Sequence, residues 1–311
     1  MRRLLVLFVA AVAVAAAVLI SVGAPPLGTD PRTAGLQVPA GGPLPLAVEP
    51  DPDEPPDLGL TGPPVALAPP GGAIIQGGVV RLLKPKVELI GARRVGIQVG
   101  HLEIADVPAE YGTRLPTQTG ATFAGYDEVD VNQDIAERTA KLLTAQGVQV
   151  DILPATVPEG YVADVFIALH CDSDGVGDVS GFKMAHGSRR GPHEEKLLQT
   201  IKTTYAAETG LDYDTEHITR NMTQLYSFSW SRYQHATSAF TPSVILEMGF
   251  LSNRADRNLL VNQPDRIAIA IANGILNFLD TTPRSKIFGE DLLIPQAPIR
   301  QGQAATPSPS R

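Results

Sequence analysis

Hydrophobic residues in the central part of the chain follow two alternating patterns. Short apolar or alternating runs predict β-strands at Arg94–Gly100, Val148–Leu153, Ala163–His170, Gly181–Ala185 and Ser243–Met248. Apolar residues at helical spacing predict helices at Asp130–Gln146, Pro192–Glu208, Arg254–Val261 and Pro264–Leu279. This alternation predicts a single three-layer α/β domain, with a mostly parallel sheet of about six strands flanked by helices.

The first 24 residues differ from the rest of the chain. After Met1-Arg2-Arg3, an apolar run of 21 residues extends from Leu4 to Ala24 without a charged residue. A membrane helix needs about 20 such residues, whereas the core of a signal peptide needs about 7–15. The two arginines favour a cytoplasmic N-terminus, which places the following chain outside the membrane. Residues 1–24 are therefore predicted to be a membrane anchor or a signal peptide.

Proline positions divide the remaining chain. Fourteen of the 27 prolines lie in residues 25–70, and only seven lie in residues 93–280. Proline lacks the backbone N–H donor and fixes φ, so the proline-rich part cannot form a long helix or a central strand. The chain then divides into a tether over residues 25–92, one folded domain over residues 93–280 and a disordered tail over residues 281–311. Within the tether, Ala73–Ile90 alternates enough to add an edge strand or hairpin to the domain.

The charge balance argues against a nucleic-acid partner. The chain has a net charge of −8, and residues 93–280 carry 15 Lys and Arg against 24 Asp and Glu. A phosphate backbone requires the opposite sign. The single cysteine, Cys171, cannot form an intramolecular disulfide, which is compatible with a bacterial envelope protein. No internal repeat is present, and we expect a monomer.

Two of the six histidines occupy positions suited to a functional site. His101 and His170 each follow an apolar strand, and functional groups of such sheets gather where the strands end. Two imidazoles in an acidic domain indicate a metal centre, because a catalytic zinc takes three protein ligands and leaves one position for water. Glu128 is a candidate third ligand, since a helix start holds a carboxylate and favours its ionised form. Spacing alone leaves four competing carboxylates open, which are Asp127, Asp130, Glu103 and Asp106.

Four motifs, in order along residues 93–280, resemble a known family. The first is Gly100-His101 at the end of a strand, and the second is Glu128 followed by Asn132 at the start of a helix. The third is the apolar strand that ends in His170, and the fourth is Glu247-Met248-Gly249-Phe250-Leu251-Ser252-Asn253. Together they make the domain similar to zinc-dependent N-acetylmuramoyl-L-alanine amidases of the Amidase_3 type.

This resemblance implies a fold, a site and a reaction. The fold would be phosphorylase/hydrolase-like, and one Zn²⁺ per domain would be held by His101, Glu128 and His170, with Glu247 as the catalytic carboxylate. The reaction would be hydrolysis of the amide bond between N-acetylmuramic acid and L-alanine in peptidoglycan. The protein would then act in the extracytoplasmic cell envelope of a bacterium, either anchored in the membrane through residues 1–24 or secreted.

Other functions stay open because the chain departs from the family pattern. Leu102-Glu103 replaces the usual glycine pair, and 27 positions separate His101 from Glu128, with Thr117–Gly120 expected as a loop over the site. One alternative is another zinc amidohydrolase or carboxypeptidase that cleaves a different peptide or acyl-amino-acid amide. The second alternative is a wall-binding module that has lost catalysis.

The residues after His170 also have two interpretations each. Strand alternation directs Cys171 away from His170, so we expect a buried thiol rather than a ligand. Asp172, Asp174 and Asp178 have the oxygen ligands of a hard-cation site, but a solvated acidic loop is the favoured interpretation.

Overall fold

The structure is a computed structural model that describes residues 73–76, 79–85, 91–187 and 191–295. The predicted anchor in residues 1–24 and most of the predicted tether lie outside the described residues. All described elements belong to one of the two compact units of the chain, residues 56–311. No helix within the described ranges is long and apolar enough to cross a membrane.

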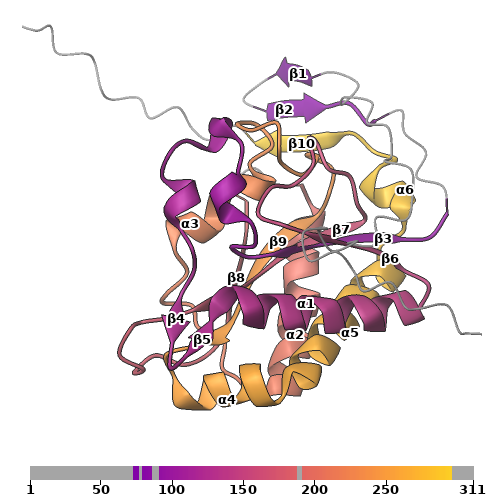
Figure 1. The fold of residues 1–311 in the computed structure, drawn as a ribbon. Helices are drawn as coiled ribbons and strands as arrows, with labels where there is room; N and C mark the ends of the chain where they lie inside the picture. Colours follow the sequence, from indigo (N-terminus) through magenta and orange to yellow (C-terminus); the bar gives the residue numbers. More distant parts are fainter. Residues whose placement is uncertain (1–72, 77–78, 86–90, 188–190, 296–311) are drawn as a thin grey trace, which may run out of the picture. The chain divides into compact units, whose positions relative to one another are not determined.

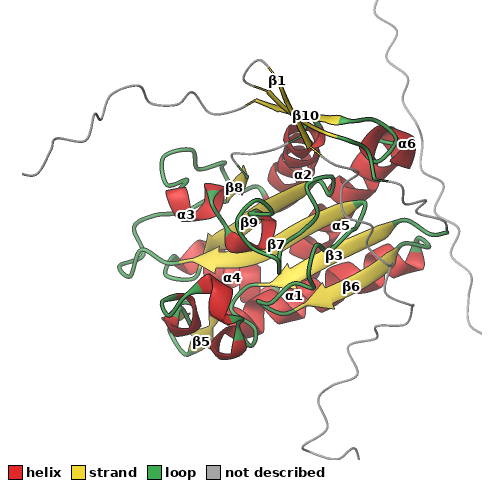
Figure 2. Cartoon of the chain, turned by 90° about the horizontal axis from the view of Figure 1, so that it is seen from above, coloured by secondary structure: helices red, strands yellow, loops and turns green. Residues whose placement is uncertain are grey.

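A five-stranded sheet forms the centre of the domain (Figure 2). Its strand order is β6-β3-β7-β9-β8, and the strands are β3 (Arg94–Val99), β6 (Gln149–Leu153), β7 (Val165–Asp172), β8 (Lys183–His186) and β9 (Ser243–Phe250). The first four strands in this order are parallel, and β8 is antiparallel to β9. The predicted α/β class and mostly parallel sheet are confirmed, with five strands in place of about six.

Three helices cover one face of this sheet (Figure 1), and these are α1 (Glu128–Ala145), α2 (His193–Thr209) and α5 (Pro264–Thr281). Each helix directs an apolar stripe toward the sheet, where Ile135, Ile201 and Ile271 are fully buried. The shorter helix α4 (Arg254–Asn262) packs against β9 and α5. The strands alternate apolar residues toward this helical layer, so the main core lies between the sheet and the helices.

Connecting segments cover the opposite face of the sheet. Met222 in α3 (Arg220–Thr223) and Phe228 in the 3-10 turn η4 (Tyr226–Phe228) pack there against Phe166 of β7 and Ile245 of β9. Successive strand residues point to opposite faces, so residues two or four positions further along each strand share this face. His170 and Glu247 are such residues, and both lie near the carboxyl ends of their strands.

The long segment between β3 and α1 is not a plain loop. It contains three short 3-10 turns, η1 (Ile104–Asp106), η2 (Ala109–Tyr111) and η3 (Leu115–Thr117), followed by a hairpin of β4 (Thr122–Phe123) and β5 (Tyr126–Asp127). The hairpin leads directly into α1. Residues 118–121 therefore enter the region where β3 ends and α1 begins.

The flanking segments form a second sheet. The predicted hairpin is present as β1 (Ala73–Gln76) and β2 (Val79–Leu82), and β10 (Leu292–Pro295) pairs with β2 on its other side. This antiparallel sheet is separate from the central sheet, so the hairpin does not extend an edge of the central sheet.

The structure corrects the predicted disordered tail over its first part, residues 281–295. This part contains α6 (Arg284–Ile287) as well as β10, and Leu292 and Ile294 are buried. Arg284 also forms an ion pair with the fully buried Asp164 at 2.7 Å. The proline-rich composition hid this order because tertiary contacts, rather than local pattern, hold the segment. Residues 296–311 lie outside the described part of the chain.

Candidate metal centre

His101, Glu128 and His170 come together at the carboxyl end of the central sheet. His101 follows β3, Glu128 is the first residue of α1, and His170 lies near the end of β7. One ring nitrogen from each histidine and one carboxylate oxygen all lie within 4.8 Å of one another. Within the residues that the structure describes, this is the single group of three or more His, Cys, Asp or Glu side chains placed to hold a metal ion.

The Glu128 carboxylate is buried and fixed by hydrogen bonds. Its Oε1 accepts from the backbone N–H of Cys171 at 3.1 Å and from the side-chain amide of Asn132 at 3.3 Å, and its Oε2 accepts from the Ala121 N–H at 2.8 Å. Burial alone raises the pKa of Glu128. The hydrogen bonds and charges of the two nearby histidines outweigh burial and hold this pKa well below its ordinary value. The carboxylate therefore stays ionised, as a cation ligand must be.

The backbone around His101 fixes which nitrogen faces the site. His101 has φ of 69°, a left-handed conformation that is rare for residues other than glycine and is concentrated at functional sites. Its Nδ1 lies 2.5 Å from the carbonyl oxygen of Gln118, so the ring donates a proton from Nδ1. Nε2 is then the nitrogen that faces Glu128, at 3.2 Å from Oε1. Gln118 thus sets the tautomer in the way that outer partners orient metal-binding histidines.

His170 approaches the same carboxylate oxygen from the sheet. Its Nδ1 lies 3.1 Å from Glu128 Oε1, and its ring meets that of His101 edge-on, with centroids 4.8 Å apart. Gly100 leaves the space for this ring, since a Cβ at Gly100 would lie 2.5 Å from ring atoms of His170. A residue without a side chain is therefore required at the end of β3.

These positions fit a tetrahedral divalent cation. With bonds of about 2.0–2.1 Å to nitrogen and oxygen, neighbouring ligand atoms around zinc lie roughly 3.3 Å apart. The distances from Glu128 Oε1 to the two histidine nitrogens are 3.2 and 3.1 Å. Two imidazoles and one carboxylate are also a donor set of catalytic zinc sites that leave one position for water. The two distances from the carboxylate and the chemistry of the donors thus suit such a metal.

Glu247 of β9 lies beside this group. In the parallel ladder its partner is His170, so the two side chains are neighbours on one face. On the other side its partner is Lys183 of β8. Burial raises the pKa of Glu247 well above its ordinary value, and the charges of Glu128 and Asp172 raise it further, whereas Lys183 opposes this shift. A carboxylate in this environment is suited to proton transfer.

Comparison with known families identifies the domain. The Amidase_3 family model, described as N-acetylmuramoyl-L-alanine amidase, matches residues 95–277, which is more than half of the chain. The chain belongs to this family. It is an N-acetylmuramoyl-L-alanine amidase that hydrolyses cell-wall amide bonds, and it acts on peptidoglycan in the cell envelope or outside the cell. The resemblance stated from the four sequence motifs is confirmed.

Solved structures of several amidases resemble this chain. The N-acetylmuramoyl-L-alanine amidase from Clostridium difficile 630 is 17% identical, with a TM-score of 0.43, and the match covers 62% of this chain and 100% of that one. Ami1 from Mycobacterium smegmatis is 20% identical, with a TM-score of 0.46 and coverage of 62% and 99%. AmiC2 of Nostoc punctiforme is 21% identical, with a TM-score of 0.41 and coverage of 61% and 99%. A search of curated proteins gave no match.

The competing carboxylates of this amidase lie outside the metal group. Asp127 accepts a hydrogen bond from the Thr122 hydroxyl at 2.6 Å within the β4–β5 hairpin. Glu103, Asp106 and Asp130 are exposed. The structure therefore selects Glu128 from a set that spacing alone could not resolve.

Of the residues after His170, Cys171 lies on the face that strand alternation predicts, and the carboxylates of Asp172 and Asp174 have protein partners. Cys171 is 2% exposed in the core on the helical side, and burial raises the pKa of its thiol well above the ordinary value. Asp174 accepts hydrogen bonds from four backbone N–H groups of residues 176–179, so its carboxylate closes a loop. Asp172 forms an ion pair with Lys183.

Two groups at the site carry no clear signal in the sequence. The first is the Gln118 carbonyl, which binds His101 and acts through its backbone, so no side-chain pattern marks it. The second is Lys183, whose side chain is only 2% exposed. A lysine within a predicted strand of a buried sheet could have indicated a buried ion pair with a carboxylate.

Proposed function

We propose that this amidase is zinc-dependent and cleaves the amide bond between N-acetylmuramic acid and L-alanine of peptidoglycan. In this proposal His101, Glu128 and His170 hold the zinc, and Glu247 is the catalytic carboxylate. The observation that carries it is the convergence of the three donor side chains from β3, α1 and β7, with Glu247 adjacent to His170 in the sheet.

Each side chain has a defined task in this mechanism. Bound zinc would supply a Lewis acid that polarises the scissile carbonyl and activates water. Glu128 contributes a negative charge that its hydrogen bonds keep ionised and in place. His101 contributes Nε2, because its Nδ1 is engaged by the Gln118 carbonyl. Gly100 keeps the His170 ring position free of steric overlap.

Glu247 would move the proton. Its carboxylate accepts a proton from the attacking water and passes it to the nitrogen of L-alanine as the amide breaks. An amine is a poor leaving group unless it is protonated, so the same carboxylate serves as base and then as acid. Glu247 is partly exposed, so a substrate could reach it. The neighbouring Glu128, in contrast, is only 4% exposed.

Replacement of Glu247 by glutamine tests this assignment. Glu247→Gln should bind zinc as the wild type does, because Glu247 is not one of the proposed ligands, but turnover should fall about 10²- to 10⁴-fold. The assay digests purified peptidoglycan and identifies products by mass, with free stem peptides beginning with L-alanine as the expected product. Glu137→Gln, an exposed change on α1, is the matched control. Full turnover by Glu247→Gln would refute the assignment.

We also propose that the domain acts at the wall as a monomer attached to the membrane through residues 1–24. The residues from 25 to 72, which precede the β1–β2 hairpin, would reach up to roughly 150 Å in polyproline form at about 3.1 Å per residue. The apolar run of 21 residues and the proline-rich stretch after it support this arrangement. Recovery of the full chain in washed membranes rather than in the culture medium would test it, and secretion of a shortened chain would contradict the anchor.

A further inference from the structure

Lys183 is a buried cation that the proposed mechanism does not use. The residue is 1% exposed, and it lies on β8 at the edge of the central sheet. Lysine is almost never fully buried without a partner, because removal of an ammonium group from water is energetically costly. Its position therefore requires an explanation beyond packing.

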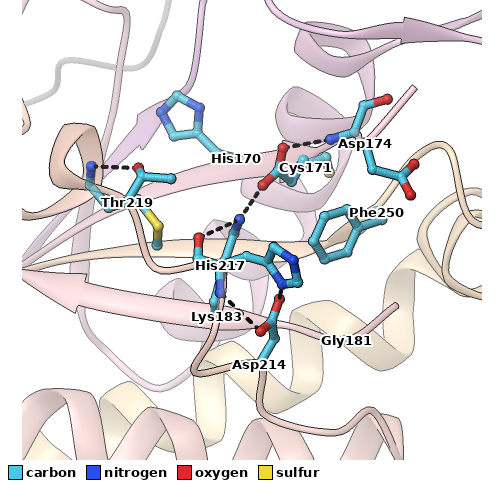
Figure 3. A network of polar contacts seen from close by, with 12 residues as sticks. His170, Cys171, Asp174, Gly181, Lys183, Asp214, His217, Thr219 and Phe250 are labelled. Carbon is cyan, nitrogen blue, oxygen red and sulfur yellow. Dashed lines mark hydrogen bonds and ion pairs between the residues drawn. The ribbon is translucent and has the colours of Figure 1, made fainter. Parts of the chain in front are cut away.

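Two acceptors fix the Lys183 ammonium group (Figure 3). Its Nζ donates to the Asp172 carboxylate at the end of β7 and to the carbonyl oxygen of His217 at 3.0 Å. The ring of Phe250 lies 5.0 Å from the nitrogen, within the range of a cation–π contact. Lys183 thus reaches from one edge strand, across β9, to the strand that carries His170.

The 214–217 turn is held against the same group. His217 Nδ1 lies 2.7 Å from Asp214 Oδ2, and its ring meets Phe250 edge-on, with centroids 6.3 Å apart. Figure 3 shows the Lys183 side chain directed to the His217 backbone, beside the Phe250 ring. These contacts fix the ammonium from several sides, so its charge has a defined position.

That position is next to the proposed catalytic carboxylate. Lys183 is the direct cross-strand partner of Glu247 in the β8–β9 ladder, and Glu247 is the partner of His170 in the β7–β9 ladder. Directly opposite residues have Cβ atoms about 4.5–5.5 Å apart and share one face. His170, Glu247 and Lys183 therefore form a row of ligand, carboxylate and cation across three adjacent strands.

We propose that Lys183 is a positioning residue for the amidase reaction: its buried ammonium, anchored by Asp172 and the His217 carbonyl, holds a fixed positive charge beside Glu247 and orients that carboxylate toward the metal group. This inference rests on the proposed role of Glu247. Three carboxylates, Glu128, Asp172 and Glu247, gather at this end of the sheet, and Lys183 supplies a positive charge among them. An apolar side chain would fill the same space at lower desolvation cost, so packing alone does not account for a lysine here.

Kinetics of Lys183 variants test the proposal on a soluble N-acetylmuramoyl peptide. Lys183→Met keeps the volume and removes the charge, and kcat should fall about 10- to 100-fold, as for other outer residues that orient a metal site. KM should change less than about twofold, and zinc content should match the wild type. Lys183→Arg keeps the charge and should recover most of kcat. Lys141→Met, an exposed change on α1, is the control.

The double variant Asp172→Asn/Lys183→Met separates positioning from stability. Loss of one partner leaves a buried charge unpaired, whereas loss of both restores a compatible interior. The melting temperature should therefore recover in the double variant, while kcat stays low. Recovery of kcat together with the melting temperature would overturn the proposal, and so would loss of zinc from Lys183→Met.

Glu247→Gln, measured in the same series, distinguishes the two proposals. If Glu247→Gln is inactive and Lys183→Met turns over like Lys141→Met, only the role of Lys183 is refuted. If Glu247→Gln is fully active, the proposed function fails, and the inference on Lys183 fails with it.

Discussion

Replacement of Gly100 by alanine should weaken zinc binding without unfolding the domain. Gly100 closes β3 and does not have a positive φ, so alanine meets no backbone strain there. The new Cβ, however, would lie 2.5 Å from Cε1 and Nδ1 of His170 and 2.7 Å from Nε2. The whole imidazole ring, rather than one flexible atom, must therefore move.

The size of this movement sets the expected loss of affinity. Nonbonded carbon atoms pack at about 3.5–4.0 Å, so the ring must shift by roughly 1 Å. A metal site tolerates ligand displacements of only about 0.2 Å. Misplacement of a ligand by its supporting residues costs about 10- to 100-fold in metal affinity, which corresponds to about 1.4–2.8 kcal/mol of binding free energy.

Competition with a fluorescent zinc chelator measures this loss, and thermal unfolding of the metal-free protein reports its effect on the fold. Gly274→Ala is the matched control, because its added Cβ would lie 2.6 Å from Ile201 Cα where α5 packs against α2, far along the chain from the metal ligands. That variant should lower the free energy of unfolding by about 1–3 kcal/mol and leave the zinc affinity of the folded protein unchanged. Wild-type zinc affinity in Gly100→Ala would refute the steric argument.

Two further predictions concern charged groups of the fold. Asp164→Ala should lower the free energy of unfolding by about 3–5 kcal/mol, because it removes the fully buried carboxylate that pairs with both Arg93 and Arg284. Asp265→Ala, which loses an exposed ion pair, should lower it by less than about 1 kcal/mol in the same urea titration. Burial raises the pKa of Asp214, but hydrogen bonds from His217 and Glu216 outweigh it and lower this pKa from its ordinary value of 3.8. The ionised carboxylate therefore stabilises the fold above about pH 4. The difference in unfolding free energy between wild type and Asp214→Asn should shrink as the pH falls below 3.8. A difference that stays constant down to pH 2 would contradict that reasoning.

Local pattern predicted most of the central fold. Apolar runs of four to eight residues gave all five strands of the central sheet, and helical periodicity gave α1, α2, α4 and α5 within about two residues of their ends. These elements bury their apolar faces against one another, so the periodicity of the sequence and the packing agree. The second sheet was harder to predict, because β10 depends on pairing with β2 about 210 positions earlier. Local composition carries no information on such a pairing.

The proximity of His101, Glu128 and His170 was predictable from the residues at strand ends, together with the family motifs, and their role as metal ligands stays a prediction. Topology explains this proximity, because parallel strands bring their carboxyl ends to one edge and the start of α1 places Glu128 beside them. The choice of Glu128 over Asp127 and Asp130 required more than spacing. Only the helix start directs one carboxylate inward, where the Cys171 and Ala121 N–H groups bind it. Its neighbours remain exposed on the first turn or in the hairpin.

The position of the Asp172–Lys183 ion pair beside Glu247 could not be predicted from sequence spacing. Asp172 and Lys183 are 11 positions apart, which along one chain suggests two solvated residues in successive strands. In the sheet, β9 is inserted between β7 and β8, so the pair spans the strand that carries Glu247. Because β9 follows β8 by more than 50 residues in the chain but lies between β7 and β8 in the sheet, Asp172 and Lys183 surround the proposed catalytic carboxylate of Glu247. The order of strands in the sheet, rather than the order of residues in the chain, determines which charges act on the reaction.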